Sequence, residues 1–560
     1  MKQIQILAKK NSTEYGELQE LARDFWKWRA LHQPLSSDDI PRIERPPAWV
    51  PDWSPQTIAG RRADIARFEE QWRGIDASRW SITQQVDHKL MGSALARVRW
   101  ELDVTRSHEV NPDFYVNQTL GSIYVLLLKP PPFDSIRSED ILTRMQHIPQ
   151  TVEEAKTNLE NNSVRPFALA VIEKLEGIGN RFEKVVAELK PFINDDIGRQ
   201  LESATADAIV ALTEFHNWLK ARLPRMKMET AVGRNAYVFF LSQVALMPFT
   251  PEELMSMSVQ EWDRSVAFET FEQVRNADLP ELSLFPDQAA QMKREEELEH
   301  EVRRFLEAKN IMSVPNWVRH YRNLPLPPYV EPLAFMGVTD DLTSANRLDQ
   351  DGISYIKVPS PDLDYFSLSI ARDPRPLIVH EGVPGHYFQL VLSWAHENPI
   401  RRHYYDSGAN EGIGFYAEEL MLQFGLFDDR PRVREIMYNY MRLRALRVEV
   451  DVKLALGLFT IDQAADHLQN VAGIDRATAW QEATFFASAP GQAITYQIGK
   501  VQIVKFLADA KRIQQDRFNL RAFHDFVWKN GNVPIALQRW EYLGLDDEIR
   551  SIDNEPRQLE

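Results

Sequence analysis

Apolar residues recur every three or four positions along most of the chain, the spacing that lets an α-helix bury one face. The first clear stretch opens with Asn11 and Glu14, a pair that can cap a helix start, and continues with the apolar positions Leu18, Leu21, Phe25 and Trp28. Similar stretches follow as far as about residue 275. The pattern predicts a mainly α-helical protein in which residues 1–275 form a helical N-terminal half.

Two further helix starts are indicated by capping pairs. Thr151 and Glu154 have the spacing of a capping box, in which each side chain satisfies a backbone N–H of the other residue. Thr250 and Glu253 have the same spacing, and Pro251 between them occupies the first helical position, where proline is favoured. Both pairs therefore predict the first residues of a helix.

The periodicity changes between residues 276 and 371. Residues 276–331 lose and then regain helical spacing, and we interpret them as a linker with a connecting helix. Three short stretches rich in β-branched or aromatic residues follow, namely PLAFMGV, GISYIKV and YFSLSIA. They predict a small antiparallel sheet between about residues 332 and 371. Residues 332–560 form the second predicted half, and the two halves are expected to enclose a cleft.

Composition excludes several classes of function. Of the 560 residues, 44% are hydrophobic, enough for a large core, and the net charge is −16. No basic domain stands out to neutralise phosphates, which argues against a nucleic-acid partner. The chain has no cysteine, so any zinc must be held by histidine, aspartate or glutamate. Neither a secretory signal nor a run of about 18 apolar residues is visible, so we expect a cytoplasmic protein without a membrane partner.

The stretch with the clearest chemical character is HEGVPGH, from His380 to His386. In the common zinc motif two histidines lie four residues apart on one helical face, with a glutamate, here Glu381, beside the first. Six residues separate the histidines of this chain, and on an unbroken helix that step turns about 600° and rises about 9 Å. Pro384 and its two neighbouring glycines can form a bulge. We predict that the insert loops out and returns His386 to the side of His380.

A further carboxylate, Glu411, follows His386 by 25 residues. Ser407 or Asn410 can cap a helix that begins here, from which Glu411 and Glu418 project on one side. Glu419 points away from that stripe. Two imidazoles, a glutamate beside the first and this distant carboxylate are the components of a hydrolytic zinc centre, with three protein ligands, an open position for water and a base.

Three segments of the last third of the chain, HEGVPGHYFQ, EGIGFYAE and APGQAITYQIG, resemble the domain of unknown function 885 family, whose members resemble gluzincin-type zinc metallopeptidases. The resemblance implies a large helical metallopeptidase-like fold with a central cleft and one Zn²⁺ per chain. His380, His386 and Glu411 would be its ligands. Glu418 would support them, because the step from Glu411 is similar to the third-ligand segment of thermostable carboxypeptidases and oligopeptidases. The family usually has tryptophan where this chain has Ile413, a departure that concerns a pocket wall.

The same resemblance extends to the substrate side of the site. Tyr496, in TYQIG, is expected to stabilise the oxyanion, with a structural core tyrosine as the alternative. Gln492 is a candidate substrate contact, with a structural loop role as the alternative. Arg444, on a long amphipathic helix with Arg442 and Arg447, is a candidate for binding a substrate carboxylate. The competing interpretation for the three arginines is a solvated or ion-paired helix face.

The sequence thus predicts a zinc metallopeptidase acting on short peptides or small amides. Glu381 would be the general base that activates water at the metal. Two alternatives stay open, a zinc hydrolase of a non-peptide amide or ester and a non-catalytic helical binding protein with a relic metal site. The substrate, the cleavage position and the oligomeric state are left open.

Overall fold

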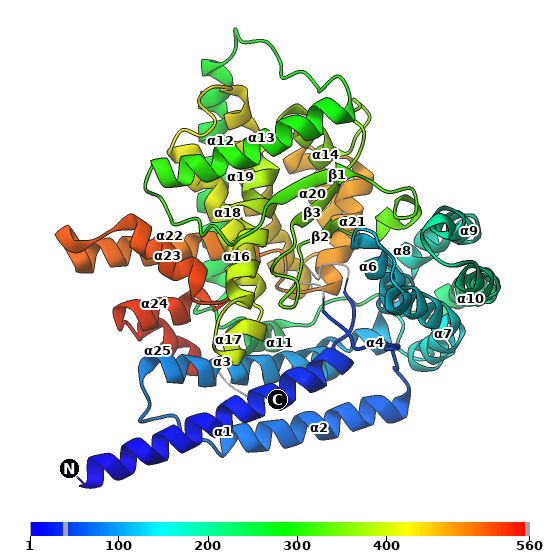
Figure 1. Cartoon of the computed structure of the whole chain (residues 1–560), viewed down its shortest axis with the longest axis horizontal. Coiled ribbons are helices and arrows are strands. Elements are labelled where there is room, and N and C mark those ends of the chain that lie inside the picture. Colours follow the sequence, from blue (N-terminus) through cyan, green and yellow to red (C-terminus); the bar gives the residue numbers. More distant parts are fainter. Residues whose placement is uncertain (1, 37–42, 555–560) are drawn as a thin grey trace.

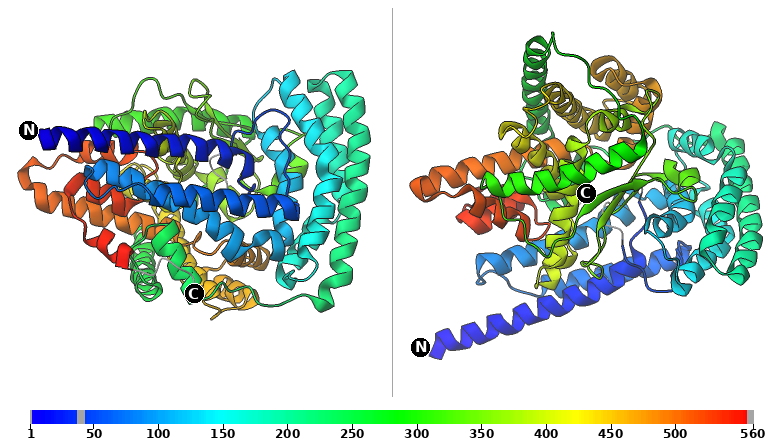
Figure 2. Two further views of the ribbon diagram at one scale, coloured as in Figure 1. Left: turned by 90° about the horizontal axis from the view of Figure 1, so that it is seen from below. Right: turned by 45° about the horizontal axis from the view of Figure 1, so that its top comes forward.

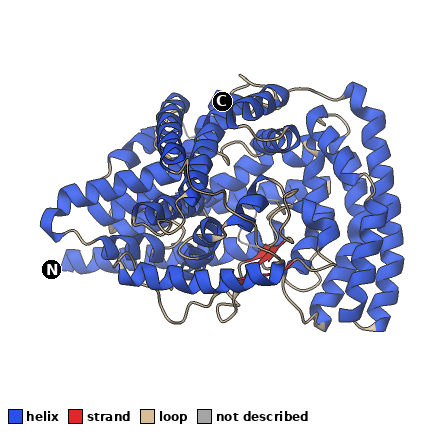
Figure 3. Cartoon of the chain, turned by 90° about the horizontal axis from the view of Figure 1, so that it is seen from above, coloured by secondary structure: helices blue, strands red, loops and turns tan. Residues whose placement is uncertain are grey.

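The computed structural model describes residues 2–36 and 43–554, and nearly all of its regular structure is helical, as predicted (Figures 1 and 3). Labels with η mark 3-10 or π-helical turns. The first half contains α1 (Lys2–His32), α2 (Pro55–Arg73), α3 (Ile82–Arg99), η1 (Trp100–Thr105), α4 (Ser107–Val110), α5 (Pro112–Val116), η2 (Asn117–Gly121), α6 (Ser122–Leu128), α7 (Ser135–Leu159), α8 (Arg165–Leu175), α9 (Ile178–Leu189), η3 (Lys190–Phe192), α10 (Asp195–Arg222), η4 (Leu223–Arg225), α11 (Arg234–Phe239), η5 (Phe240–Val244) and α12 (Pro251–Arg275).

The helices of the second half surround a small sheet. They are α13 (Gln288–Ala308), η6 (Glu331–Met336), α14 (Tyr365–Arg372), α15 (Arg375–Leu377), η7 (Ile378–Gly382), α16 (His386–Trp394), α17 (Pro399–His403), α18 (Ser407–Gln423), α19 (Arg432–Ala455), α20 (Ile461–Ala472), α21 (Arg476–Ser488), α22 (Thr495–Gln514), η8 (Gln515–Arg517), α23 (Leu520–Lys529), α24 (Ile535–Leu543) and α25 (Asp547–Asn554). Among residues 2–36 and 43–554, no helix has the length and apolar character needed to cross a membrane.

Two groups of helices flank a central group. Helices α1, α2 and α3 pack along one edge, with the N-terminal end of α1 extending beyond its neighbours (Figures 1 and 2). Helices α7, α9 and α10 pack as a bundle at one end of the molecule. Helices α16, α18 and α19 lie in the middle, α22 packs against α18 and extends to one side, and the candidate chemistry lies on these helices and on η7.

The predicted helix starts have different outcomes. The capping box at Thr250 is confirmed, because Glu253 N donates to Thr250 Oγ1 over 3.2 Å and Thr250 N donates to Glu253 Oε2 over 2.8 Å. The start at Asn11 is wrong, since α1 already begins at Lys2. The apolar stripe of that helix is buried as expected, at Leu18, Leu21 and Phe25.

The start predicted at Thr151 is also wrong. Thr151 and Glu154 lie inside α7, which begins at Ser135. Its cap is Asp134, whose side chain accepts a hydrogen bond of 2.8 Å from Arg137 N. Glu154 instead accepts a hydrogen bond of 2.8 Å from Trp53 N. A tertiary contact therefore takes the carboxylate that local spacing assigned to a cap.

The hydrophobic core has one large part in each half, but both parts draw residues from elsewhere in the chain. The larger cluster centres on α1–α10 and also contains Ile353 of β3 and Trp540 of α24. The second centres on α16, α18, α19, α22 and α23, and includes Leu298 of α13. The boundary predicted near residue 275 stays a prediction.

The small sheet is mixed rather than antiparallel. Its strands are β1 (Tyr321–Pro325), β2 (Asp340–Asp341) and β3 (Gly352–Ile356), in the order β1-β3-β2. Strand β1 pairs parallel to β3, while β2 pairs antiparallel to it. All residues of β3 are buried, as is typical of a strand covered on both faces.

Two of the three predicted strands are helical turns. PLAFMGV lies largely in η6, and YFSLSIA lies in α14. Asp364 starts α14 by accepting a hydrogen bond of 3.0 Å from Ser367 N, a cap that the aromatic composition of the stretch obscured. Strand β1 precedes the predicted range, in a proline-rich stretch that does not have a strand-like composition. The sheet does lie next to the motif segment, because α13 and β1 pack together and α13 contacts η7.

Candidate metal centre

The motif HEGVPGH is broken into two short helical pieces. Turn η7 carries His380 and Glu381, and α16 begins at His386. The chain folds back so closely that a Cβ atom at Gly385 would lie 1.7 Å from the carbonyl oxygen of His380. Glycine is therefore required at this position. The ring centroids of His380 and His386 lie 4.6 Å apart, which confirms the predicted loop-out.

Helix α18 carries Glu411 toward the two rings. It begins at Ser407 and is capped by Asp406, whose carboxylate accepts a hydrogen bond of 2.7 Å from Ala409 N. The predicted caps, Ser407 and Asn410, are thus inside the helix, and that part of the prediction is wrong. Asp406 is itself fixed by tertiary structure, because its N–H donates to Asn532 Oδ1 over 2.6 Å.

The three predicted ligands converge on one point. Glu411 Oε2 lies 3.1 Å from His386 Nε2 and 3.4 Å from His380 Nε2. All three side chains are buried. A Cβ atom at Gly414 would lie 3.1 Å from Cε1 of both rings, so the glycine leaves the space in which the imidazoles rest against α18.

The other two glutamates lie on different sides of the histidines. Glu381 Oε2 lies 3.9 Å from His386 Nε2, and its side chain is 20% exposed, so it can meet a substrate or water. Glu418 Oε1 lies 2.6 Å from His380 Nδ1, although the two groups are not aligned as a hydrogen bond. Arg444 Nη2 lies 3.1 Å from the same oxygen of Glu418. Glu418 therefore links the first histidine to an arginine.

The next residue along α18, Glu419, points away from the cluster as predicted. It forms ion pairs of 2.7 Å with Arg264 and 2.8 Å with Lys500. Because Glu418 and Glu419 are adjacent on a helix, their side chains leave it in directions about 100° apart. Only the first belongs to the histidine cluster.

The local charges shift the pKa values of the cluster in opposite directions. Burial lowers the pKa of His380, but Glu411 and Glu418 outweigh that effect and raise it to about 9. Burial raises the pKa of Glu411, but His386 and His380 outweigh it and hold the pKa well below its usual range. The Glu411 carboxylate is thus favoured in its ionised form, which is also the form that binds a cation.

The donor atoms fit a divalent transition-metal ion. Within the described residues, the buried oxygen Glu411 Oε2, which faces Nε2 of both histidines, has no hydrogen-bond partner. In tetrahedral zinc sites, bond lengths of about 2.0–2.2 Å place neighbouring ligand atoms about 3.3 Å apart. The separations of Glu411 Oε2 from the two imidazole nitrogens, 3.1 and 3.4 Å, bracket this value. The His380, Glu381 and His386 side chains also have ligand atoms that all lie within 4.8 Å of one another.

Tyr496 reaches the cluster because α22 packs tightly across α18. A Cβ atom at Gly412 would lie 2.6 Å from the Cα of Gly499, so the two backbones meet at a pair of glycines. Tyr496, at the start of α22, stacks on His380 with ring centroids 6.2 Å apart and planes 14° apart. The tyrosine is therefore beside the metal cluster.

A cavity of about 690 Å³ opens above the cluster. Its wall includes the polar groups of His380, Glu381, Glu418, Arg444, Arg447 and Tyr496. Apolar side chains complete the wall, among them Leu326, Phe366, Ile370 and Leu377. The cavity therefore combines a few converging polar groups with an apolar lining, as small-molecule sites do.

The three candidate arginines are all ion-paired. Arg442 pairs with Glu269 at 3.2 Å, Arg444 with Glu418 at 3.1 Å, and Arg447 with Glu482. Arg444 and Arg447 nevertheless line the cavity, and each guanidinium lies 5.5 Å from the ring centroid of Tyr496. A substrate-binding role for Arg444 stays a prediction.

Gln492 lies outside the lining of this cavity. Its amide nitrogen donates to Ser407 Oγ over 3.0 Å, and it lines a neighbouring pocket that also contains Arg29 and His108. The bond ties the loop before α22 to the first residue of α18. Its substrate role also stays a prediction.

Two residues that are structurally important to the site, Gly414 and Asp451, were not predicted from the sequence. Gly414 makes room for both imidazoles, and it stands three residues after Glu411, where its presence on the ligand face was a usable signal. Asp451 anchors the loop before Tyr496 by accepting from Gly491 N over 2.9 Å and Ala493 N over 2.8 Å. No local pattern marked Asp451, because its partners lie 40 or more residues away in sequence.

A mainly helical fold with a buried histidine and glutamate cluster beneath a cavity defines this chain as a candidate metal-binding protein. Residues 47–540 match the family described as "Bacterial protein of unknown function (DUF885)", and the chain belongs to that family. No curated protein matches it significantly.

Two solved structures share the fold. One is a "putative lipoprotein of unknown function" from Shewanella oneidensis, with a TM-score of 0.67, 17% identity, and coverage of 94% of this chain and 98% of the other. The second is a "putative lipoprotein" from Colwellia psychrerythraea, with a TM-score of 0.72, 16% identity, and coverage of 97% and 99%. At such identities the likeness concerns the fold alone.

Proposed function

We propose that this protein is a zinc-dependent hydrolase that cleaves amide bonds, those of short peptides in particular. The observation that carries the proposal is the convergence of His380, His386 and Glu411. Glu411 Oε2 lies 3.1 Å from His386 Nε2 and 3.4 Å from His380 Nε2, and these separations are typical of ligands that share one zinc ion. The resemblance to gluzincin-type peptidases supports the choice of amide substrates.

When bound, zinc would polarise the scissile carbonyl and lower the pKa of a water molecule. Glu381 has the exposure and position of the general base, since its carboxylate borders both the cluster and the cavity. It would take a proton from the attacking water and deliver it to the leaving amine. Tyr496, stacked on His380, would donate a hydrogen bond to the oxyanion.

Glu418 and Arg444 would orient the first histidine. Glu418 Oε1 lies 2.6 Å from Nδ1 of His380, on the edge of the ring away from Nε2, which faces Glu411. Arg444 in turn balances the buried charge of Glu418. Arrangements of this kind fix the tautomer of a ligand histidine and raise its basicity.

The walls of the cavity support a substrate with an apolar side chain. Phe366, Ile370 and Leu377 line it close to the polar groups of the cluster. Its volume of about 690 Å³ suits a few amino-acid residues rather than a folded protein. A non-peptide amide or ester of the same size is the second candidate substrate, and the cytoplasmic location stays a prediction.

The test combines metal analysis with one conservative variant. We expect zinc at the cluster in the wild-type chain and peptide cleavage that Glu381→Gln reduces by about 10²- to 10⁴-fold while the zinc stays bound. Glu397→Gln, which changes an exposed glutamate outside the motif, is the matched control and should retain activity. A chain that binds no zinc, or a Glu381→Gln variant with wild-type activity, would overturn the proposal.

A digest of a peptide library, followed by mass spectrometry, tests the substrate class. Cleaved peptides would support the peptidase and would show at which end the cut falls. Hydrolysis of small amides or esters by the zinc-loaded chain, with the whole peptide library left intact, would favour the second substrate.

A further inference from the structure

A second group of side chains of the types that bind metals lies outside the candidate centre, on α13 and beside the start of β1. Helix α13 and strand β1 pack together (Figure 1). It consists of Glu299 and His300 of α13 and of His320, the residue before β1. One ligand atom from each residue lies within 4.8 Å of the others. Neither the predicted hydrolase chemistry nor the cavity uses these residues.

The geometry of the group leaves one carboxylate oxygen facing two imidazoles. Glu299 Oε1 is engaged by Arg303 Nε at 2.6 Å and by Tyr321 N at 3.3 Å. Glu299 Oε2 lies 3.0 Å from His320 Nδ1 and 4.0 Å from His300 Nδ1. The two imidazole rings have centroids 4.5 Å apart. The spacing of about 3.3 Å found among zinc ligands lies between the separations of Glu299 Oε2 from the two imidazole nitrogens, 3.0 and 4.0 Å.

The group is anchored on one side and open on the other. The side chain of Glu299 is 2% exposed, while those of His300 and His320 are 46% and 44% exposed. The backbone of His320 is held by two bonds, since Gly352 N donates to its carbonyl over 2.9 Å and its own N–H donates to Asp351 Oδ1 over 3.2 Å. An ion can thus enter from solvent and keep water in its remaining coordination position.

We propose that Glu299, His300 and His320 bind a divalent transition-metal ion of the zinc class, independently of the centre at His380. Two imidazoles and one carboxylate are a ligand set that zinc accepts with a water as the fourth ligand. Arg303 completes the arrangement, because its charged hydrogen bond holds Glu299 Oε1 and leaves Oε2 directed at the imidazoles, where it is hydrogen-bonded to His320 Nδ1 and where the ion would replace the shared proton.

The ion would join α13 to the edge of the sheet. Tyr321 follows His320 directly, and its ring fills the space beside Gly382, where an added Cβ atom would lie 2.6 Å from Tyr321 Cδ1. Gly382 ends η7, which carries His380 and Glu381. The surface ion would therefore be bound by the residue next to Tyr321, whose ring packs against this segment.

The experiment uses the whole chain, stripped with a chelator and titrated with Zn²⁺ in a calorimeter, with bound zinc counted by mass spectrometry. Wild type is expected to bind about two ions per chain, and His300→Ala and His320→Ala about one each. Both substitutions are at half-exposed positions, so the fold should tolerate them. His216→Ala, a histidine of α10 outside both groups, is the matched control and should bind as wild type does.

A second readout separates this site from the candidate centre. Zn²⁺ should raise the midpoint of thermal unfolding of His386→Ala, which lacks a ligand of that centre, but should not do so for the double variant His386→Ala with His320→Ala. If His320→Ala binds as many ions as wild type, the surface site is refuted whatever the state of the first. If the wild type binds one ion and His320→Ala none, the surface site stands and the centre at His380 fails.

Discussion

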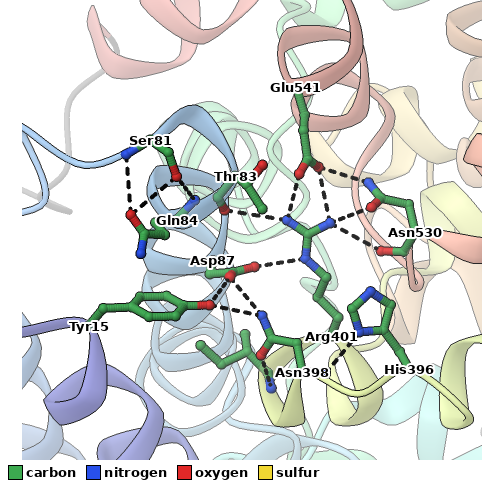
Figure 4. A network of polar contacts seen from close by, with 11 residues as sticks. Tyr15, Ser81, Thr83, Gln84, Asp87, His396, Asn398, Arg401, Asn530 and Glu541 are labelled. Carbon is green, nitrogen blue, oxygen red and sulfur yellow. Dashed lines mark hydrogen bonds and ion pairs between the residues drawn. The ribbon is translucent and has the colours of Figure 1, made fainter. Parts of the chain in front are cut away.

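Two buried polar clusters in this protein differ in how their donors and acceptors are paired. The first surrounds Arg401 and joins α1, α3, α17 and α24 (Figure 4). Arg401, with a side chain 2% exposed, donates to Asp87 over 2.8 Å and to both oxygens of Glu541 over 3.0 Å. Asp87 also accepts from Tyr15 over 2.6 Å and from Asn398 over 2.7 Å. Donors and acceptors in this cluster complement each other.

The second cluster, at His380, brings acceptors together instead. In the part of the chain that the structure describes, Glu411 Oε2 is buried against Nε2 of both histidines and lacks a hydrogen-bond partner. An unsatisfied buried polar atom costs about 1–3 kcal/mol. Such a cost is accounted for if a cation binds where the lone pairs meet. The comparison indicates that the Arg401 cluster holds the fold together and that the His380 cluster binds a ligand, and the following variants test that distinction.

The largest expected effect is on stability at the Arg401 cluster. Arg401→Ala leaves Asp87 and Glu541 buried without their cation, and we expect it to lower the free energy of unfolding by about 3–5 kcal/mol. Chemical denaturation measures the change. Arg199→Ala, which removes an ion pair whose partners are 70% and 73% exposed, is the control and should cost less than about 0.5 kcal/mol. Folded Arg401→Ala should keep its zinc, and loss of zinc with unchanged stability would contradict the division of roles.

Tyr496→Phe should be the next largest effect, and it concerns turnover alone. Removing an oxyanion donor typically lowers kcat by about 10²- to 10³-fold. Zinc content and unfolding should not change, because the ring that stacks on His380 is retained. Tyr440→Phe, on the wall of the same cavity, is the control. A wild-type kcat for Tyr496→Phe would show that the tyrosine packs against His380 and does not stabilise the oxyanion.

Glu418→Gln is expected to weaken zinc binding by about 10- to 100-fold, because a neutral amide supports the His380 ring less well than the negatively charged carboxylate beside Nδ1 does. Competition with a zinc-binding dye gives the affinity. Glu419→Gln alters the next residue, which pairs with Arg264 and Lys500 instead, and it should leave the affinity within about twofold. Equal zinc affinities of the two variants would show that Glu418 does not support the zinc ligands.

The smallest effect is predicted for Tyr15→Phe. The substitution removes one of several donors to Asp87, which keeps its bonds to Arg401 and Asn398. Hydrogen bonds to charged groups contribute about 1.5–3 kcal/mol, and the remaining donors should hold the loss near the lower limit. Chemical denaturation measures this loss in the free energy of unfolding. Turnover should not change. A loss as large as that of Arg401→Ala would show that the cluster depends on Tyr15 as much as on the arginine.

The sequence by itself determined the features that depend on local spacing. Helical periodicity predicted the mainly α fold, and the capping box at Thr250 formed as expected. The six-residue spacing of the histidines, with glycine and proline between them, predicted the loop-out that brings the rings within 4.6 Å. Glu411 and Glu418, seven residues apart, had to leave α18 on the same side because two helical turns separate them.

Only the tertiary structure decided which distant groups meet. Strand β1 pairs parallel to β3 across a long connection, and no local pattern specifies such a partner. Arg444 pairs with Glu418 and Asp451 holds the loop before Tyr496 because α18, α19 and α22 pack together. The same holds for Glu299 and His320, which α13 and β1 bring together from 21 residues apart. Contacts of this kind depend on how helices and strands pack, and packing depends on the whole core rather than on any one segment.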